Sequence, residues 1–321
     1  MNNILTKSGK FSVIFACVLP LVVSASAQLS LRRALDFDGD GKADFSVMRP
    51  SNNIWYINKT NGTFTFQPFG SFVTDTPTPG DYDGDGKADI SVFRDDNGTW
   101  YRLNSMTNTF TGVQFGTTGD EPVARDYDGD GKTDIAVVRR SNGVMTWYVS
   151  GSMRGFFAAQ FGAEIDYVAP GDYDGDGKFD FAVQRPGTTG NAPANFYILQ
   201  TSNNTLLSVA WGFSNDLVAP GDYDGDGKTD IAVVREGTNL NETIFWYIRR
   251  STNGSLSAVS FGATGTDLLA QADYDGDGKT DIGVWRDTNG FFYALRSTNN
   301  SLLAVQWGAA NDTPIASFDT H

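Results

Sequence analysis

Aspartate is concentrated in a short pattern that recurs along the chain. In the stretch DYDGDGKTDIAVVR, which occurs identically at residues 126–139 and 222–235, aspartates stand at positions 1, 3, 5 and 9 and glycines at positions 4 and 6. Carboxylates this close together repel one another unless a cation lies between them. Calcium binds about six to eight oxygen ligands in flexible geometry, and glycine permits the sharp turns of a tight acidic loop. The pattern therefore predicts a calcium loop.

The pattern occurs six times, at intervals of 45, 45, 46, 50 and 51 residues. An array with a period of this size is typical of propellers and solenoids. Six identical spacings argue against ordinary acidic turns. The copies are DFDGDGKAD from Asp36, DYDGDGKAD from Asp81, DYDGDGKTD from Asp126, DYDGDGKFD from Asp172, DYDGDGKTD from Asp222 and DYDGDGKTD from Asp273.

The first 27 residues have the features of a secretory signal peptide. Lys7 and Lys10 form a basic region, FSVIFACVLPLVV is an apolar core, and residues 25–27 (ASA) supply the small-residue cleavage pattern. The apolar core is too short for a membrane span, and IFAC around Cys17 is a poor lipoprotein motif. We expect a secreted, extracellular protein whose single domain covers residues 28–321 and has no membrane span, with the bacterial cell surface or periplasm as alternatives.

Composition agrees with calcium-dependent rigidity. Cys17 is the only cysteine, so the expected processed chain has no disulfide to stabilise it outside the cell. That chain has 22 basic and 38 acidic side chains, and 24 of the acids are the aspartates of the six loops. Six bound Ca²⁺ ions would leave a net charge of −4, so the acidity is mostly ligand charge. Nucleic acid is excluded as a partner by this balance.

Each repeat contains four short strand patterns. The loop is followed by a β-branched run such as DIAVVR, an aromatic pair such as Trp147-Tyr148, and a last run that ends in Phe-Gly or Trp-Gly, and one strand precedes the loop. Four short antiparallel strands per 40 to 50 residues form one propeller blade. The aromatic pairs recur at one place in every blade, which favours core packing over sugar stacking.

An EF-hand is the obvious alternative for the loop. It requires a bidentate Glu at position 12 and a helix after it. Position 12 is valine in every copy, within a strand-like run, so the EF-hand is rejected. These valines are Val47, Val92, Val137, Val183, Val233 and Val284.

These features together resemble the FG-GAP repeat of integrin-like propellers, also found as VCBS-type repeats in secreted bacterial proteins. The boundary WGFSNDLVAPGDYDGDGKTD contains both halves of the pattern, the aromatic-glycine doublet and the Ala-Pro-Gly-Asp entry into the loop. VARDYD, AQADYD and RALDFD depart from that entry but keep the ligands. The resemblance implies about six calcium sites, each held by the side chains at positions 1, 3, 5 and 9 and the backbone carbonyl at position 7. The implied ligands are Asp36, Asp38, Asp40, Lys42 and Asp44; Asp81, Asp83, Asp85, Lys87 and Asp89; Asp126, Asp128, Asp130, Lys132 and Asp134; Asp172, Asp174, Asp176, Lys178 and Asp180; Asp222, Asp224, Asp226, Lys228 and Asp230; and Asp273, Asp275, Asp277, Lys279 and Asp281.

We predict an all-β propeller of six four-stranded blades, with seven blades, one of them incomplete, as the alternative. Asp319 falls where a seventh loop would begin, and PIASF before it looks like another innermost strand. One end of the chain must therefore complete the blade of the other, and the sequence does not distinguish between the two ends.

The sequence contains few residues for catalysis or for binding metals other than calcium. His321 is the only histidine and the processed chain has no cysteine, which excludes His-dependent triads and zinc sites. Position 14 is arginine in every copy, and a structural pair with an acid or carbonyl between blades is favoured over a ring that binds acidic glycans. These arginines are Arg49, Arg94, Arg139, Arg185, Arg235 and Arg286.

The expected function is a binding or adhesion module for extracellular carbohydrate or protein ligands. A calcium-dependent polysaccharide lyase is the alternative, and a structural piece of an extracellular matrix is a third hypothesis. The long connections at residues 185–196 and 235–243 break the regularity of the repeats, so a ligand-binding face is expected there.

Overall fold

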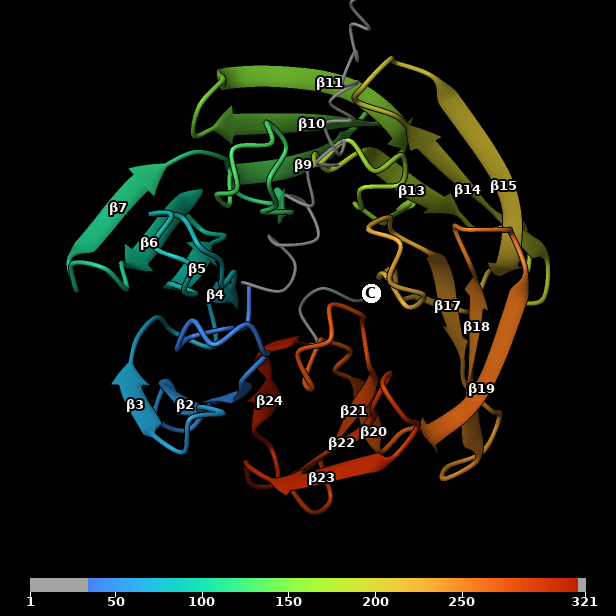
Figure 1. The fold of residues 1–321 in the computed structure, drawn as a ribbon. Helices are drawn as coiled ribbons and strands as arrows, with labels where there is room; N and C mark the ends of the chain where they lie inside the picture. Colours follow the sequence, from blue (N-terminus) through green and yellow to red (C-terminus); the bar gives the residue numbers. More distant parts are fainter. Residues whose placement is uncertain (1–33, 317–321) are drawn as a thin grey trace, which may run out of the picture.

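The computed structural model describes residues 34–316, which form a ring of six four-stranded sheets (Figure 1). The predicted six-bladed β-propeller is thereby confirmed. The predicted signal peptide, Cys17, Asp319 and His321 lie outside the described residues. Among the residues that are described, no helix is long and apolar enough to cross a membrane.

Strands follow one another outward in each blade, and neighbours are antiparallel. The first blade contains β1 (Phe45–Arg49), β2 (Ile54–Asn58) and β3 (Phe64–Pro68). The second contains β4 (Asp75–Pro77), β5 (Ile90–Arg94), β6 (Thr99–Leu103) and β7 (Phe110–Gln114). The third contains β8 (Glu121–Pro122), β9 (Ile135–Ser141), β10 (Val144–Gly151) and β11 (Gly155–Ala163).

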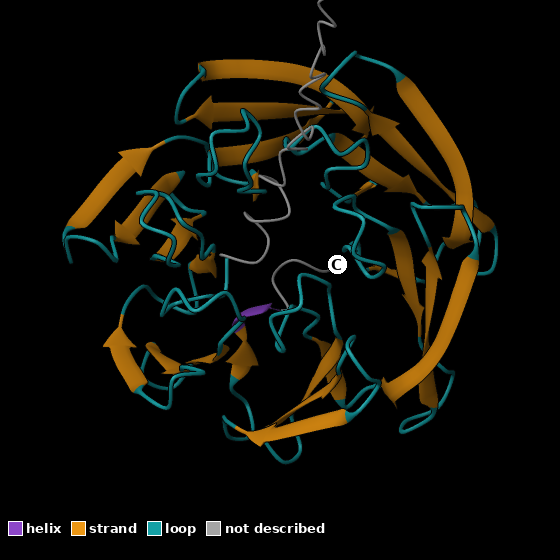
Figure 2. Cartoon of the chain, in the orientation of Figure 1, coloured by secondary structure: helices purple, strands orange, loops and turns teal. Residues whose placement is uncertain are grey.

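The remaining blades repeat this order, and Figure 2 shows the strands of the blades connected by loops around the ring. The fourth contains β12 (Tyr167–Val168), β13 (Phe181–Arg185), β14 (Pro193–Leu199) and β15 (Leu206–Phe213). The fifth contains β16 (Leu217–Val218), β17 (Ile231–Arg235), β18 (Thr243–Arg249) and β19 (Leu256–Ala263). The sixth contains β20 (Asp267–Leu269), β21 (Ile282–Arg286), β22 (Phe291–Leu295) and β23 (Leu302–Gln306).

The C-terminal side closes the ring. The last strand, β24 (Thr313–Pro314), pairs with β1 and is the innermost strand of the first blade. Val47 of β1 faces Tyr56 of β2 on one side and Pro314 on the other. The largest hydrophobic cluster contains residues of the first, second and sixth blades, so apolar packing also spans the closure.

The second strand of each blade is buried along four of its five or more residues, because both of its faces lie against neighbouring sheets. The outermost strand instead alternates between half-buried and exposed residues. Valine at position 12 lies within the buried second strand of every blade, which confirms the strand predicted there in place of an EF-hand helix.

The aromatic pairs are core residues, as predicted. Their first members, such as Trp55 and Trp100, are fully buried, whereas the tyrosines that follow are half-buried. The indole nitrogens of Trp55, Trp100, Trp147 and Trp246 donate to the carbonyl oxygen of the phenylalanine in the Phe-Gly doublet of the same blade. These bonds satisfy the one polar group of a buried indole and fix the end of the outermost strand.

Candidate metal centres

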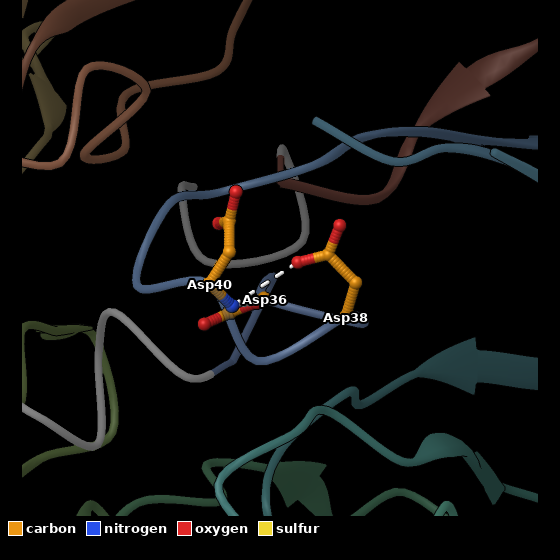
Figure 3. A group of neighbouring side chains, drawn as sticks. All are labelled: Asp36, Asp38 and Asp40. Carbon is orange, nitrogen blue, oxygen red and sulfur yellow. Dashed lines mark hydrogen bonds between the residues drawn. The ribbon is translucent and has the colours of Figure 1, made fainter. Parts of the chain in front are cut away.

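Each acidic loop lies directly before the second strand of its blade, and in blades two to six it joins the innermost strand to that second strand. In the first loop, Oδ1 of Asp36 accepts the Gly39 N–H at 2.6 Å and Oδ2 accepts the Gly41 N–H at 2.8 Å. The two glycines have φ values of 81° and 86°, a region that L side chains rarely adopt. Figure 3 shows Asp36, Asp38 and Asp40 of this loop, with the Asp40 N–H donating to Asp38. The turn thus wraps the backbone around the carboxylate at position 1.

The loops bring carboxylate oxygens together in groups of three. Six such groups occur among the described residues, and within each group the ligand atoms lie within 4.8 Å of one another. Positions 1, 3 and 5 form the group in the loops that begin at Asp36, Asp81 and Asp222. Positions 1, 3 and 9 form it in the loops that begin at Asp126 and Asp172. The carbonyl oxygen at position 7 stays a predicted ligand.

The aspartate at position 9 is almost fully buried in every loop, with 0 or 1% of its surface exposed. Oδ2 of Asp44 accepts the Phe37 N–H, and Oδ1 accepts the Thr60 N–H from the turn between β2 and β3, both at 2.8 Å. Burial raises the pKa of Asp44 to about 7, although the N–H donors lower it. The pKa values of Asp134 and Asp180 are also raised to about 7, again mainly by burial. A buried carboxylate whose pKa is raised in this way lacks a compensating positive charge.

The donor set fits calcium. All the side-chain donors are carboxylate oxygens, which a hard divalent cation prefers. Oδ1 of Asp128 and Oδ1 of Asp224 are buried and have no hydrogen-bond partner among the described residues. A buried unpaired carboxylate oxygen is unfavourable, and a bound cation would supply the missing interaction.

Each loop has a second contributor that the acidic pattern did not predict. A Ser or Thr at the turn between the third and fourth strands donates its backbone N–H to Oδ1 of the position 9 aspartate, and the distances run from 2.6 to 2.8 Å. Hydroxyl groups of the same residues reach position 5 in several blades, as in the bond from Ser152 to Asp130. The recurrence of a hydroxyl residue just after the third strand could have revealed them. They are Thr60, Ser105, Ser152, Thr201, Ser251 and Ser297.

The position 14 arginines form structural ion pairs, as favoured, but within blades and not between them. Arg94 donates from Nε and Nη2 to the two oxygens of Asp75, at 2.7 and 2.8 Å, and packs over the ring of Tyr101. Asp75 is buried on the innermost strand and also accepts the Ser71 N–H. The other pairs are Arg49 with Asp312, Arg139 with Asp120, Arg185 with Asp166, Arg235 with Asp216 and Arg286 with Asp267. A ring of arginines free to bind glycans is therefore not present among the described residues.

A cleft lies between the first and second blades, beside their acidic loops. Its volume is about 230 Å³, and Ile57, Ile90 and Leu103 form its apolar part. Lys59 and Lys87 add positive charge to its wall. Such a lining suits a ligand with an apolar face and an anionic group.

An equivalent cleft of about 260 Å³ lies between the fifth and sixth blades. Ile248, Ile282 and Leu295 occupy the same repeat positions as the three apolar residues of the first cleft, and Arg250 and Lys279 take the places of the two lysines. Asn300 here and Asn108 in the first cleft both have positive φ values, 56° and 54°, so the backbone turns also correspond. Asp224, a loop residue with an unpartnered oxygen, lines this second cleft.

The predicted binding connections lie at the other end of the sheets. Residues 186–192 and 236–242 join the second strand to the third, whereas the acidic loops of the same two blades join the first strand to the second. Both connections bond to the segment that leaves the same blade, through Gly187 to Ser214 and Gly237 to Thr264. Ligand binding by these connections stays a prediction.

Fold and loops together define a β-propeller in which each blade has one acidic loop whose carboxylates could hold a metal ion. The sequence matches the FG-GAP-like repeat family over residues 36–92, 81–137, 126–183 and 222–284, and the chain belongs to this family. The predicted resemblance is confirmed. No curated protein matches the sequence.

Solved structures share the fold at low identity. TolB from Acinetobacter baumannii is 16% identical with a TM-score of 0.54, over 85% of this chain and 66% of TolB. An Agrocybe aegerita lectin described as recognising non-reducing terminal N-acetylglucosamine is 17% identical with a TM-score of 0.52, over 88% of this chain and 79% of the lectin. At these identities the likeness concerns the fold alone.

Proposed function

We propose that this protein is a secreted calcium-binding β-propeller that acts as a binding or adhesion module for extracellular carbohydrate or protein ligands. The calcium part is supported by the six groups of carboxylates, by their burial and by the unpartnered oxygens of Asp128 and Asp224. Calcium supplies charge compensation and fixes the loops. The loop residues provide ligands that are all oxygen atoms, and the strands next to each loop hold the ends of the loop in place.

The ligand part is carried by the two equivalent clefts between blades. Each combines an apolar part with two cationic side chains, a lining that suits a sugar ring with a carboxylate or sulfate group. The lectin with the same fold supports a carbohydrate over a protein ligand. We therefore place acidic polysaccharides first among the candidates.

A panel of acidic and neutral polysaccharides tests this function. The chain should retain an acidic polysaccharide in the presence of calcium, and retention should fall on substitution Lys59→Ala or Arg250→Ala. Arg154→Ala is the matched control, because Arg154 is an exposed cation near the same end of the third blade that packs over Phe157 and lines neither cleft.

If neither cleft substitution reduces retention of the polysaccharide, binding in the clefts is contradicted. Release of unsaturated sugar products would instead identify the alternative activity, a polysaccharide lyase. If no polysaccharide of the panel binds, a protein ligand or a structural role in a matrix would be favoured instead.

A further inference from the structure

The six acidic loops are joined to one another by a closed ring of backbone hydrogen bonds. In every case the N–H at position 8 of one loop donates to the carbonyl oxygen at position 1 of the preceding loop, at 2.7 or 2.8 Å. The bonds run from Ala88 to Asp36, Thr133 to Asp81, Phe179 to Asp126, Thr229 to Asp172, Thr280 to Asp222 and Ala43 to Asp273. The last of these joins the first loop to the sixth, so the ring has no break.

A second ring is formed by the lysines at position 7. Each lies across the glycine at position 4 of the preceding loop, so closely that a Cβ built on Gly84 would lie 2.6 Å from Cε of Lys132. Nζ of Lys132 also donates to the carbonyl oxygen of Asp83, at 3.2 Å. The remaining contacts are Lys87 on Gly39, Lys178 on Gly129, Lys228 on Gly175, Lys279 on Gly225 and Lys42 on Gly276. This ring too closes between the sixth loop and the first.

Both rings connect residues that are expected to hold metal. Position 8 lies between the predicted ligands at positions 7 and 9, and its partner at position 1 is itself a ligand. An ion that orders one loop therefore also fixes a ligand residue of the preceding loop and a ligand-bearing segment of the following loop. A neighbour that is already ordered has less conformational entropy to lose when it binds its own ion.

We propose that the six loops bind calcium as one coupled ring, in which filling a loop raises the affinity of its two neighbours through the position 8 N–H and the position 7 lysine. The inference rests on the proposed calcium binding. Repulsion between bound ions acts against the coupling, and physiological salt weakens this repulsion. Coupling through contacts acts only between adjacent loops, so it weakens with distance around the ring.

The first test is a titration of the chain with calcium at physiological salt, with the heat of binding measured by calorimetry. Coupled loops predict a Hill coefficient greater than unity. Six independent sites with one affinity would overturn the coupling while leaving the proposed calcium binding intact. No binding at all would overturn both.

Hydrogen exchange of the variant Asp128→Asn at sub-saturating calcium gives the second test, since it reports each loop separately. The substitution weakens the third loop, whose neighbours are the second (residues 81–89) and fourth (residues 172–180) loops. The sixth loop (residues 273–281) lies opposite in the ring and serves as the control within the same molecule. Exchange should speed up in both neighbours, with calcium affinity there reduced roughly five-fold, and not in the sixth loop.

Faster exchange confined to the third loop, or an equal increase in all six loops, would overturn the proposed route of coupling. Lys132→Met provides a second variant that keeps all the carboxylates and most of the apolar packing. It should lower the Hill coefficient without changing the number of ions bound. An unchanged Hill coefficient in Lys132→Met would remove the lysine from the coupling.

Discussion

Arg49 and Asp312 form a two-bond ion pair across 263 residues of sequence, with Nε to Oδ1 at 2.7 Å and Nη2 to Oδ2 at 2.8 Å. The pair joins β1 to the residue just before β24, and Arg49 also packs over Tyr56. It has the same geometry as the pair of Arg94 with Asp75, whose two residues lie on adjacent strands of one continuous stretch of chain. In the first blade this repeated contact holds the ring closed.

The substitution Asp312→Asn should therefore destabilise the protein. Asp312 is buried, but the arginine is about one third exposed, so solvent moderates the loss and we expect about 2 kcal/mol. Urea unfolding measures it. Asp75→Asn removes the same bonds inside a blade and serves as the control. A loss for Asp312→Asn smaller than that for Asp75→Asn would contradict a role of this pair in closing the ring.

The calcium-free protein should become less stable as pH rises. The folded pKa of Asp44, Asp134 and Asp180 is raised to about 7, above the ordinary value of 3.8, so the folded state binds protons more tightly than the unfolded state. Protonation thus stabilises the fold at low pH, and this contribution is lost as pH rises through about 7. In chelator, the melting temperature should fall between about pH 5 and about pH 8.

Calcium should reverse that trend, because the ion binds the ionised carboxylates. Thermal melting at matched pH values, with calcium and with chelator, measures both slopes. The same slope in both conditions would mean that these carboxylates do not face the ion.

Gln184 is a polar exception in the core. It is fully buried in β13, and neither its Oε1 nor its Nε2 has a hydrogen-bond partner among the described residues. The equivalent residue of the other blades is apolar: Met48, Phe93, Val138, Val234 or Trp285. Gln184→Met should raise the free energy of unfolding by about 1 kcal/mol, because an unsatisfied buried amide is removed. Gln114→Met, at an exposed site of β7, should change nothing. A loss of stability in Gln184→Met would show that a partner satisfies the amide.

Gly84 and Gly62 offer a matched test of the packing between loops. Both have φ near 83°, so alanine is strained equally at the two sites. A Cβ at Gly62 meets nothing within 4 Å, whereas one at Gly84 would displace Lys132 of the next loop. Gly62→Ala should cost about 1 kcal/mol from the backbone alone, and Gly84→Ala clearly more. Equal losses in melting temperature would contradict the lysine contact.

The repeats, the blade architecture and the loop aspartates could be predicted from the sequence, because each has a local sequence pattern. Which end of the chain closes the ring was not predicted, although the spacing of the ion pairs indicates it. Each position 14 arginine from Arg94 onward pairs with an aspartate 19 residues earlier, whereas Ser30 stands at that distance before Arg49. Asp312 is the aspartate that completes the set. That spacing would have identified the C-terminal strand as the one that closes the ring.

Contacts between repeats were harder to foresee. The carbonyl of Asp36 and the amide of Ala88 lie more than one repeat apart, and nothing in either residue type marks the bond. The clefts arise in the same way, from side chains such as Lys59 and Lys87 that belong to different blades. Such features depend on how one sheet is placed against the next, which local patterns do not encode.

The melting temperature of the protein in millimolar calcium and then in chelator tests the central claim most directly. Since an ion that binds only the folded state stabilises that state by mass action, ions at the six loops should make the melting temperature fall strongly on chelation and recover when calcium is restored. An unchanged melting temperature would contradict the account, because it would mean that the acidic loops hold their shape without metal.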